Sequence, residues 1–154
     1  MSEPADASVH ASAVKIGDRA VLIRGPSGAG KSRLAFDLIL AGRAGQVPPA
    51  VLVGDDRVRL DTVTGQLRVR PVRQLVGLIE IRGLGIRRCD HVEEASVGLV
   101  VDLWAPDGER LPQPDTLLTC IQGINIPRLP VREGISPLHV VIAVLTTSPG
   151  SAFL

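Results

Sequence analysis

The sequence of 154 residues contains no tyrosine, and Phe36, Trp104 and Phe153 are its only phenylalanine and tryptophan residues. Because 45% of the residues are nevertheless hydrophobic, the core has to be built from valine, leucine, isoleucine and alanine. A chain of this length folds with about two thirds of its surface buried, which is enough for one domain. We therefore expect a single domain in which helices cover a β-sheet.

Long apolar runs are also missing. The longest, VGLVVDLWA and HVVIAVL, fall well short of the roughly 20 residues that a membrane helix needs. The first residues, MSEPADASVH, are acidic where a secretion signal is basic, and no apolar segment follows them. Cys89 and Cys120 do not have the spacing of a metal or redox motif, which indicates reduced thiols. We expect a cytoplasmic protein with no role at a membrane.

Charge of one sign is not in excess either, since the formal net charge is only +1. A protein that binds nucleic acid through its overall field needs a strong basic surplus, so this class is excluded. The function has to be inferred from a local site instead.

Lysine is scarce: of the 17 basic residues only Lys15 and Lys31 are lysines. Lys31 belongs to a G-x-x-x-x-G-K-[ST] motif, in which glycines let backbone N–H groups surround phosphates and the lysine reaches the outer phosphates. A flexible ammonium suits that task better than a planar guanidinium, and the motif's serine is a ligand for Mg²⁺. The predicted nucleotide-binding residues are Gly25, Pro26, Ser27, Gly28, Ala29, Gly30, Lys31 and Ser32.

The surrounding pattern places this motif between a strand and a helix. Residues 9–24 read as two strands joined at Gly17-Asp18, and 31–41 as a helix that stops near Gly42. Further strands are predicted at 50–54, on both sides of Gly65, at 95–105 and within 116–131, before a last helix that starts at Ser136-Pro137. The predicted fold is an α/β, P-loop-containing mixed β-sheet flanked by helices, with one domain over 9–154 and disorder over 1–8.

The acidic partner of the loop is open to two interpretations. Asp102, in the buried strand GLVVDLW, suits the metal carboxylate of a conventional P-loop ATPase. The pair Asp55-Asp56 also ends a strand. Consecutive extended residues point to opposite sides, so at most one of the two is expected to reach the phosphates unless the strand has already ended. Glu80 and Arg82, two apart on an apolar strand, share a face and could neutralise each other as buried charges.

Three segments, GPSGAGKSRLAFDLI, LVGDDRVRL and GLIEIRGLGI, resemble in order and interval the C-terminal catalytic domain of HPr kinase/phosphorylase. Members of this bacterial family phosphorylate a seryl residue of the phosphocarrier HPr. The E-I-R-G-x-G-I segment, Glu80 to Ile86, is a signature of the family and is more specific than the P-loop. The resemblance covers about residues 9 to 145 and is greatest to the short, single-domain members from α-proteobacteria.

The resemblance implies a role for each matching residue. Asp55 would accept the proton of the substrate serine, with Asp56 beside it near the metal. Arg82 would orient a phosphate or pair with a carboxylate of the site, and His10 would lie near the catalytic aspartate. The implied catalytic residues are Asp55, Asp56, Lys31, His10 and Arg82, and the implied metal ligands are Ser32, Glu80 and Asp56.

The leading hypothesis is an ATP- and Mg²⁺-dependent serine protein kinase acting on HPr or an HPr-like phosphocarrier, hexameric by resemblance. Members of the family also catalyse the reverse, phosphorylase reaction. However, the loop PVREGIS, residues 130–136, has Ile135 and Ser136 where the family has arginine and asparagine. This departure weakens the case for the reverse reaction. Two alternatives remain, namely a regulatory nucleotide-binding protein without transfer activity, and a P-loop ATPase or small-molecule kinase that uses Asp102.

Overall fold

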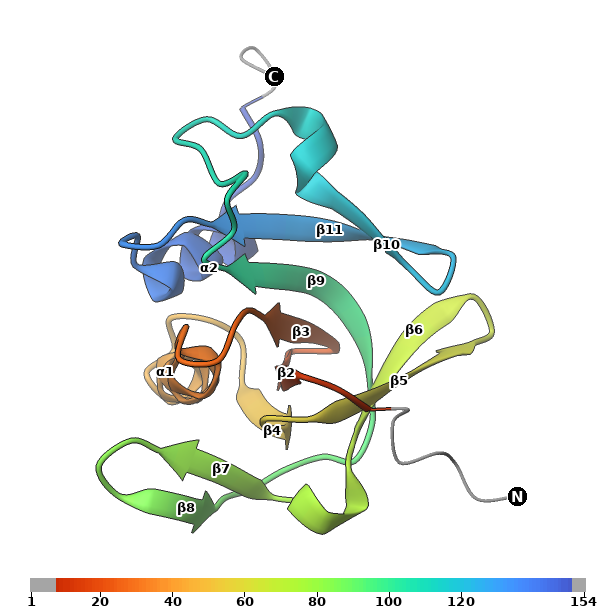
Figure 1. The fold of residues 1–154 in the computed structure, drawn as a ribbon, viewed down its shortest axis with the longest axis vertical. Helices are drawn as coiled ribbons and strands as arrows, with labels where there is room; N and C mark the ends of the chain where they lie inside the picture. Colours follow the sequence, from red (N-terminus) through yellow and green to blue (C-terminus); the bar gives the residue numbers. More distant parts are fainter. Residues whose placement is uncertain (1–7, 151–154) are drawn as a thin grey trace.

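The structure is a computed structural model that describes residues 8–150 (Figure 1). Most of the predicted N-terminal disorder, over residues 1–7, lies outside the described residues. At Ser8 the prediction is wrong, because this residue begins a short strand and pairs with Arg59. No helix within 8–150 is long and apolar enough to cross a membrane.

The chain consists mainly of strands, with one helix after β3 and one at the end, and most of these elements lie where the sequence patterns predict them. In order, the elements are β1 (Ser8–Val9), β2 (Ala11–Ile16), β3 (Arg19–Arg24), α1 (Lys31–Arg43), β4 (Ala50–Gly54), β5 (Val58–Val63), β6 (Gln66–Pro71), β7 (Leu78–Ile81), β8 (Gly85–Arg88), β9 (Ala95–Leu103), β10 (Leu118–Ile121), β11 (Ile124–Val131) and α2 (Pro137–Thr146). Short 3₁₀ turns, Arg73–Leu75 and Pro114–Leu117, precede β7 and β10. The predicted proline at the start of α2 is confirmed, although the Ser136 side chain makes no capping hydrogen bond.

The main sheet is mixed and runs in the order β1-β5-β6-β9-β3-β2-β4. Strand β9 is its centre: β3 pairs with it in parallel along one edge. Along the other edge, its first residues pair with β6 and its last four with β11. Strands β7 and β8 form a separate two-stranded hairpin below the main sheet in Figure 1.

The core is divided by this sheet into two apolar clusters. One contains Val21, Ile23 and Val101 together with the buried residues of α1 and α2, and the other contains Leu22, Val53 and residues of β6 and β9. Consecutive residues of a strand therefore enter different clusters, as the alternation of side chains requires. Both helices lie on one face, whereas strands of the curled sheet cover the other. The predicted α/β mixed sheet with helices is confirmed.

Helix α1 forms where the sequence turns from alternating to helical spacing. Leu34, Ala35, Leu38 and Ile39 are buried on its inner face, as predicted from their positions. Gly30 precedes the helix with φ 98°, in a left-handed conformation that favours glycine. The end of β3 and the start of α1 thus hold the glycine-rich loop between them, beside the carboxyl ends of the parallel strands β3 and β9.

Candidate active site

A pocket of about 620 Å³ opens between the glycine-rich loop, the first turns of α1, the end of β4 and the hairpin β7–β8. It gathers nine of the residues predicted for the site from four separate stretches of the chain. Its lining is made of His10, Ser27, Gly28, Gly30, Lys31, Ser32, Arg33, Phe36, Asp37, Asp56, Glu80, Ile81 and Arg82. Of the remaining predicted residues, Gly25, Pro26, Ala29 and Asp55 do not line it.

The glycine-rich loop is held by its own backbone and by β9. Gly25 has φ 156°, and a Cβ atom built on it would lie 3.0 Å from the Leu103 Cβ, so this position requires glycine. The Ala29 N–H donates to the Pro26 carbonyl over 3.0 Å, which closes a turn. The loop can therefore offer backbone N–H groups, next to the N-terminus of α1, to an anion.

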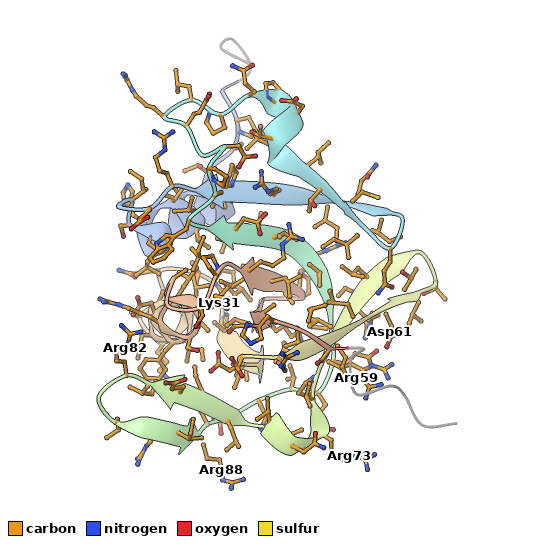
Figure 2. All side chains as sticks on the ribbon, in the orientation of Figure 1. Lys31, Arg59, Asp61, Arg73, Arg82 and Arg88 are labelled. Carbon is orange, nitrogen blue, oxygen red and sulfur yellow. The ribbon has the colours of Figure 1, made fainter. Side chains whose placement is uncertain are left out.

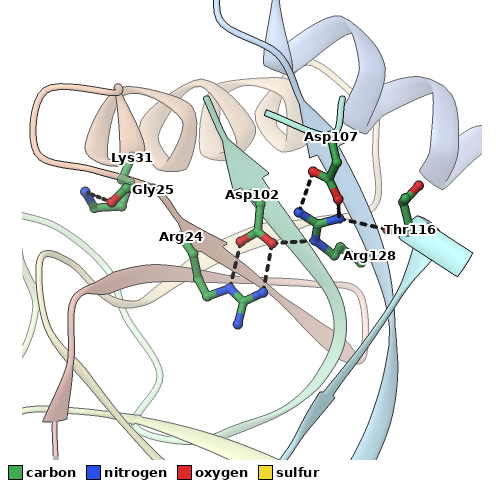
Figure 3. A network of polar contacts seen from close by, with 7 residues as sticks. All are labelled: Arg24, Gly25, Lys31, Asp102, Asp107, Thr116 and Arg128. Carbon is green, nitrogen blue, oxygen red and sulfur yellow. Dashed lines mark hydrogen bonds and ion pairs between the residues drawn. The ribbon is translucent and has the colours of Figure 1, made fainter. Parts of the chain in front are cut away.

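Lys31 is buried, and its ammonium lies within the loop. The Nζ atom donates to the carbonyl oxygen of Gly25 over 2.8 Å (Figure 3). It also donates to the carbonyl oxygen of Pro26 over 3.1 Å. A lysine that is out of water has to be hydrogen-bonded, and here backbone carbonyls satisfy it. The loop thus carries a desolvated positive charge at its centre, where the motif predicts phosphates.

Asp55 lies beneath the pocket and is only 4% exposed. Its carboxylate accepts hydrogen bonds from the Ser12 hydroxyl at 2.6 Å and from the Ser32 hydroxyl at 2.8 Å from each oxygen. A third donor is the backbone N–H of Glu80, at 3.1 Å. Asp55 therefore joins β2, the start of α1 and β7 at one point.

Asp56, unlike Asp55, lines the pocket itself. Strand β4 ends at Gly54, and Asp56 adopts φ 69°, a left-handed conformation that aspartate tolerates better than most residues. Its side chain is 61% exposed and lies 3.6 Å from the His10 Nε2 atom. Because β4 ends before both aspartates, the alternation of an extended strand does not apply to them; Asp56 lines the pocket and Asp55 lies behind Ser32.

Glu80 and Arg82 both line the pocket, and the alternative in which they share a strand face and neutralise each other is wrong. Glu80 is exposed on β7, and Arg82 is exposed in the turn that follows the end of this strand at Ile81. No ion pair between them is present within the described part of the chain. Instead Ile79 is the buried residue that anchors β7 in the core. Figure 2 shows Arg82 on the hairpin and Lys31, the first residue of α1, above it.

Asp102 is held away from this arrangement by two arginines. Its oxygens accept from the Nε and Nη2 atoms of Arg24, at 2.7 and 2.8 Å, and from the Nε atom of Arg128 at 2.5 Å (Figure 3). Arg128 continues to Asp107 and to the carbonyl of Thr116. Asp102 is not among the pocket's lining residues, so the geometry favours the Asp55-Asp56 pair over Asp102 as the acidic partner of the loop.

Burial and pairing have opposite effects on the pKa of Asp102. Burial opposes ionisation, but the hydrogen bonds and charges of Arg24 and Arg128 outweigh it and hold the pKa below its ordinary value. The hydrogen bond from Arg128 likewise lowers the pKa of Asp107, and in return Asp107 raises that of Arg128. The network is therefore ionised at neutral pH.

The donor atoms at the pocket suit Mg²⁺, which takes oxygen ligands and commonly relies on one or two carboxylates and the phosphates of a substrate. Ser32, with Asp55 hydrogen-bonded to it, and the carboxylates of Asp56 and Glu80 offer oxygen only. Among residues 8–150, no group of three or more histidines, cysteines and acidic residues is placed to hold a metal alone. These residues fit a metal that shares its ligands with a bound nucleotide.

Sequence reasoning missed several residues of the site. Ser12 is fully buried and donates to Asp55, and its signal is a polar residue inside the otherwise apolar segment ASAVKI. Phe36 and Asp37 line the pocket from α1, where Asp37 lies 3.7 Å from Arg33 one turn earlier. Their spacing from Lys31 on the predicted helix could have placed them on this side.

The fold and the glycine-rich loop define a P-loop α/β domain. The model of the HPr serine kinase C-terminal domain matches residues 4–147, and the chain belongs to this family. An HPr kinase/phosphorylase from Clostridium beijerinckii is 34% identical over 139 residues, and one from Enterococcus faecalis is 37% identical over 145 residues. Each alignment covers 82% of this chain and 43% of the relative, so the chain spans less than half the length of the curated relatives it matches.

A solved structure agrees with this assignment. The HPr(Ser) kinase/phosphatase from Coxiella burnetii superposes with a TM-score of 0.70 at 29% sequence identity. The match covers 90% of this chain and 92% of the other. The resemblance read from the three sequence segments is thereby confirmed at the level of family and fold.

Proposed function

We propose that the chain is an ATP- and Mg²⁺-dependent kinase that phosphorylates a serine of HPr or of an HPr-like phosphocarrier. The observation that carries this proposal is the meeting of Lys31, Ser32, Asp56, Glu80 and Arg82 at one pocket, with Asp55 beneath it. Phosphoryl transfer needs positioning, charge stabilisation and a group that takes the hydroxyl proton, and these residues supply all three.

The loop residues Gly25 to Ser32 would bind the triphosphate of ATP through backbone N–H groups, with the ammonium of Lys31 beside the outer phosphates. Mg²⁺, held by Ser32 and Glu80, would neutralise charge on the phosphates. Arg82, exposed at the rim of the pocket, would orient the transferred phosphoryl group.

The serine oxygen attacks the γ-phosphorus of ATP, the bond to the leaving ADP oxygen breaks, and the hydroxyl proton passes to a carboxylate. The family resemblance gives this base to Asp55, but the geometry favours Asp56. Asp55 is buried and already accepts from three donors, whereas Asp56 is exposed in the pocket beside His10. We therefore assign the base to Asp56, oriented by His10, and assign to Asp55 the task of holding Ser32.

A matched pair of variants tests the function and this assignment together. The purified chain is incubated with ATP, Mg²⁺ and HPr, and phosphoserine is detected by mass spectrometry. Asp56→Asn should lower the transfer rate by about 10² to 10⁴ while nucleotide still binds, because it removes only the base. Asp55→Asn should weaken nucleotide binding as well. ATP binding without phosphorylation of any phosphocarrier would contradict the proposed kinase function. Full transfer activity of the Asp56→Asn variant would indicate that Asp55 is the base instead.

The proposed setting is the cytoplasm, and the proposed assembly is a homo-oligomer, a hexamer by family resemblance. Cys89 and Cys120 are both free thiols, which suits a reducing compartment. Helix α2 is apolar along most of its length, yet Val141 is its only fully buried residue, and Val144 is exposed. Such a helix favours contact with a second subunit. Light scattering of the purified chain tests this assembly, and a monomer at micromolar concentration would contradict it.

A further inference from the structure

The hairpin β7–β8 carries two large apolar side chains that its own fold leaves uncovered. Leu84, in the turn, is 64% exposed, and Ile86, on β8, is 63% exposed. The opposite side of the hairpin is anchored, since Ile79 is fully buried and Ile81 packs against the helical core cluster. The hairpin therefore presents apolar surface to solvent from a fixed base.

This apolar surface adjoins the reaction pocket. Ile86 is the cross-strand partner of Glu80, so their side chains stand on the same face of the hairpin. Glu80, Ile81 and Arg82 line the pocket. The face of the hairpin that carries Ile86 therefore also carries Glu80, a residue of the pocket lining.

The surface is also basic. Arg82, Arg87 and Arg88 are exposed on the hairpin, and Glu80 is the one acidic residue between positions 78 and 88. Within residues 8–150, none of the three arginines is paired with a carboxylate. Figure 2 shows Arg88 projecting from the outer edge of the hairpin. An occupant that complements this surface carries acidic side chains around an apolar one.

We propose that Leu84, Ile86 and Arg88 form the docking platform for the protein that accepts the phosphoryl group, since Arg88 and Ile86 share one face of β8. The inference rests on the proposed kinase function. The platform binds a surface segment of the acceptor next to its target serine, through an apolar residue that packs on Leu84 and Ile86 and an acidic residue that faces Arg88. A folded acceptor is thereby selected by contacts that free serine or a small molecule lacks.

The test separates docking from catalysis. The double variant L84S/I86S should raise KM for HPr and the Kd of HPr measured by calorimetry about tenfold or more, because buried apolar contacts are lost. Its KM for ATP and its kcat at saturating HPr should stay unchanged, since no residue of the pocket is altered. Arg88→Gln should slow HPr association and reduce its dependence on salt.

Val63→Ser is the matched control, because Val63 is an apolar residue 41% exposed at the tip of another hairpin, β5–β6. If KM and Kd for HPr were unchanged in L84S/I86S, or if Val63→Ser weakened HPr binding equally, the docking platform would be overturned. The proposed kinase function would not be affected by either result. A wild-type chain that neither binds HPr nor transfers phosphate to it would overturn both proposals. The two failures are therefore distinguishable.

Discussion

The hydroxyl of Ser32 lies 2.8 Å from each carboxylate oxygen of Asp55, so one side chain joins the phosphate-binding loop to the end of β4. The same carboxylate accepts from Ser12 on β2 and from the backbone of β7. The position of the proposed nucleotide site is thus linked to the packing of the central sheet. Changes at Asp55 should consequently alter both nucleotide binding and the stability of the fold.

Asp55→Asn should lower the free energy of unfolding by about 1 to 3 kcal/mol, because it weakens charge-assisted hydrogen bonds to a buried group. Asp56→Asn should change it by less than about 0.5 kcal/mol, since that side chain is largely exposed. Urea unfolding followed by circular dichroism measures both. Equal effects of the two substitutions would show that Asp55 does not have the structural role assigned to it.

Ser12→Ala removes a hydroxyl that is fully buried and 2.6 Å from the Asp55 carboxylate. We expect a loss of about 1 to 2 kcal/mol of stability, together with weaker nucleotide binding because Asp55 loses one of its fixed donors. Ser27→Ala, at an exposed position of the loop, is the control for stability. Unfolding curves and ATP titrations provide the comparison, and a Ser12→Ala protein with wild-type stability would contradict the expectation.

Asp102→Asn breaks an ion-pair network while leaving the pocket lining intact. Stability should fall by about 2 to 3 kcal/mol, since Arg24 and Arg128 both lose a charged partner. The affinity for nucleotide should depend on Mg²⁺ as in the wild type, whereas Ser32→Ala should reduce that dependence. Loss of the Mg²⁺ dependence in Asp102→Asn alone would restore Asp102 as the metal carboxylate of a conventional P-loop enzyme.

The pH dependence of stability follows from the lowered pKa of Asp102. A carboxylate with a lower pKa in the folded than in the unfolded state stabilises the fold fully above its unfolded pKa of about 4. This contribution is lost as the pH falls through that value toward the folded pKa. Between about pH 6 and pH 3, stability should therefore decline more steeply in the wild type than in Asp102→Asn.

Asp107→Asn serves as the control for this titration, because Asp107 has a lowered pKa as well but is more exposed than Asp102. Its stability curve should lie closer to that of the wild type, since solvent screens an exposed pair. Parallel curves for wild type and Asp102→Asn would mean that the network contributes nothing to acid stability.

Local patterns predicted the loop, helix α1 and most strands, because each depends on residues close together in the sequence. The roles of the two aspartates could not be predicted in the same way. Which aspartate enters the pocket depends on the left-handed backbone conformation of Asp56. Two adjacent aspartates in a sequence do not specify that conformation. Likewise, Asp102 reads as a metal ligand until the pairing of β3, β9 and β11 brings Arg24 and Arg128 to it.

The Glu80 to Ile86 signature illustrates a different gap between sequence and structure. Its apolar residues indicate a strand, yet the turn after Ile81 makes it a hairpin, so that Arg82 and Ile86 become exposed. An apolar residue in a sequence is normally assigned to the core. Here Leu84 and Ile86 lie outside the core, on the hairpin that borders the pocket, and only the three-dimensional arrangement distinguishes them from core residues.

Lys31 has already exchanged water for the carbonyl oxygens of Gly25 and Pro26 in the folded chain. When an anion enters the loop, the cost of dehydrating this ammonium has therefore been met during folding. An arriving triphosphate has to lose mainly its own hydration shell. Its attraction to Lys31 should therefore contribute more to the binding free energy than its attraction to a solvated lysine would.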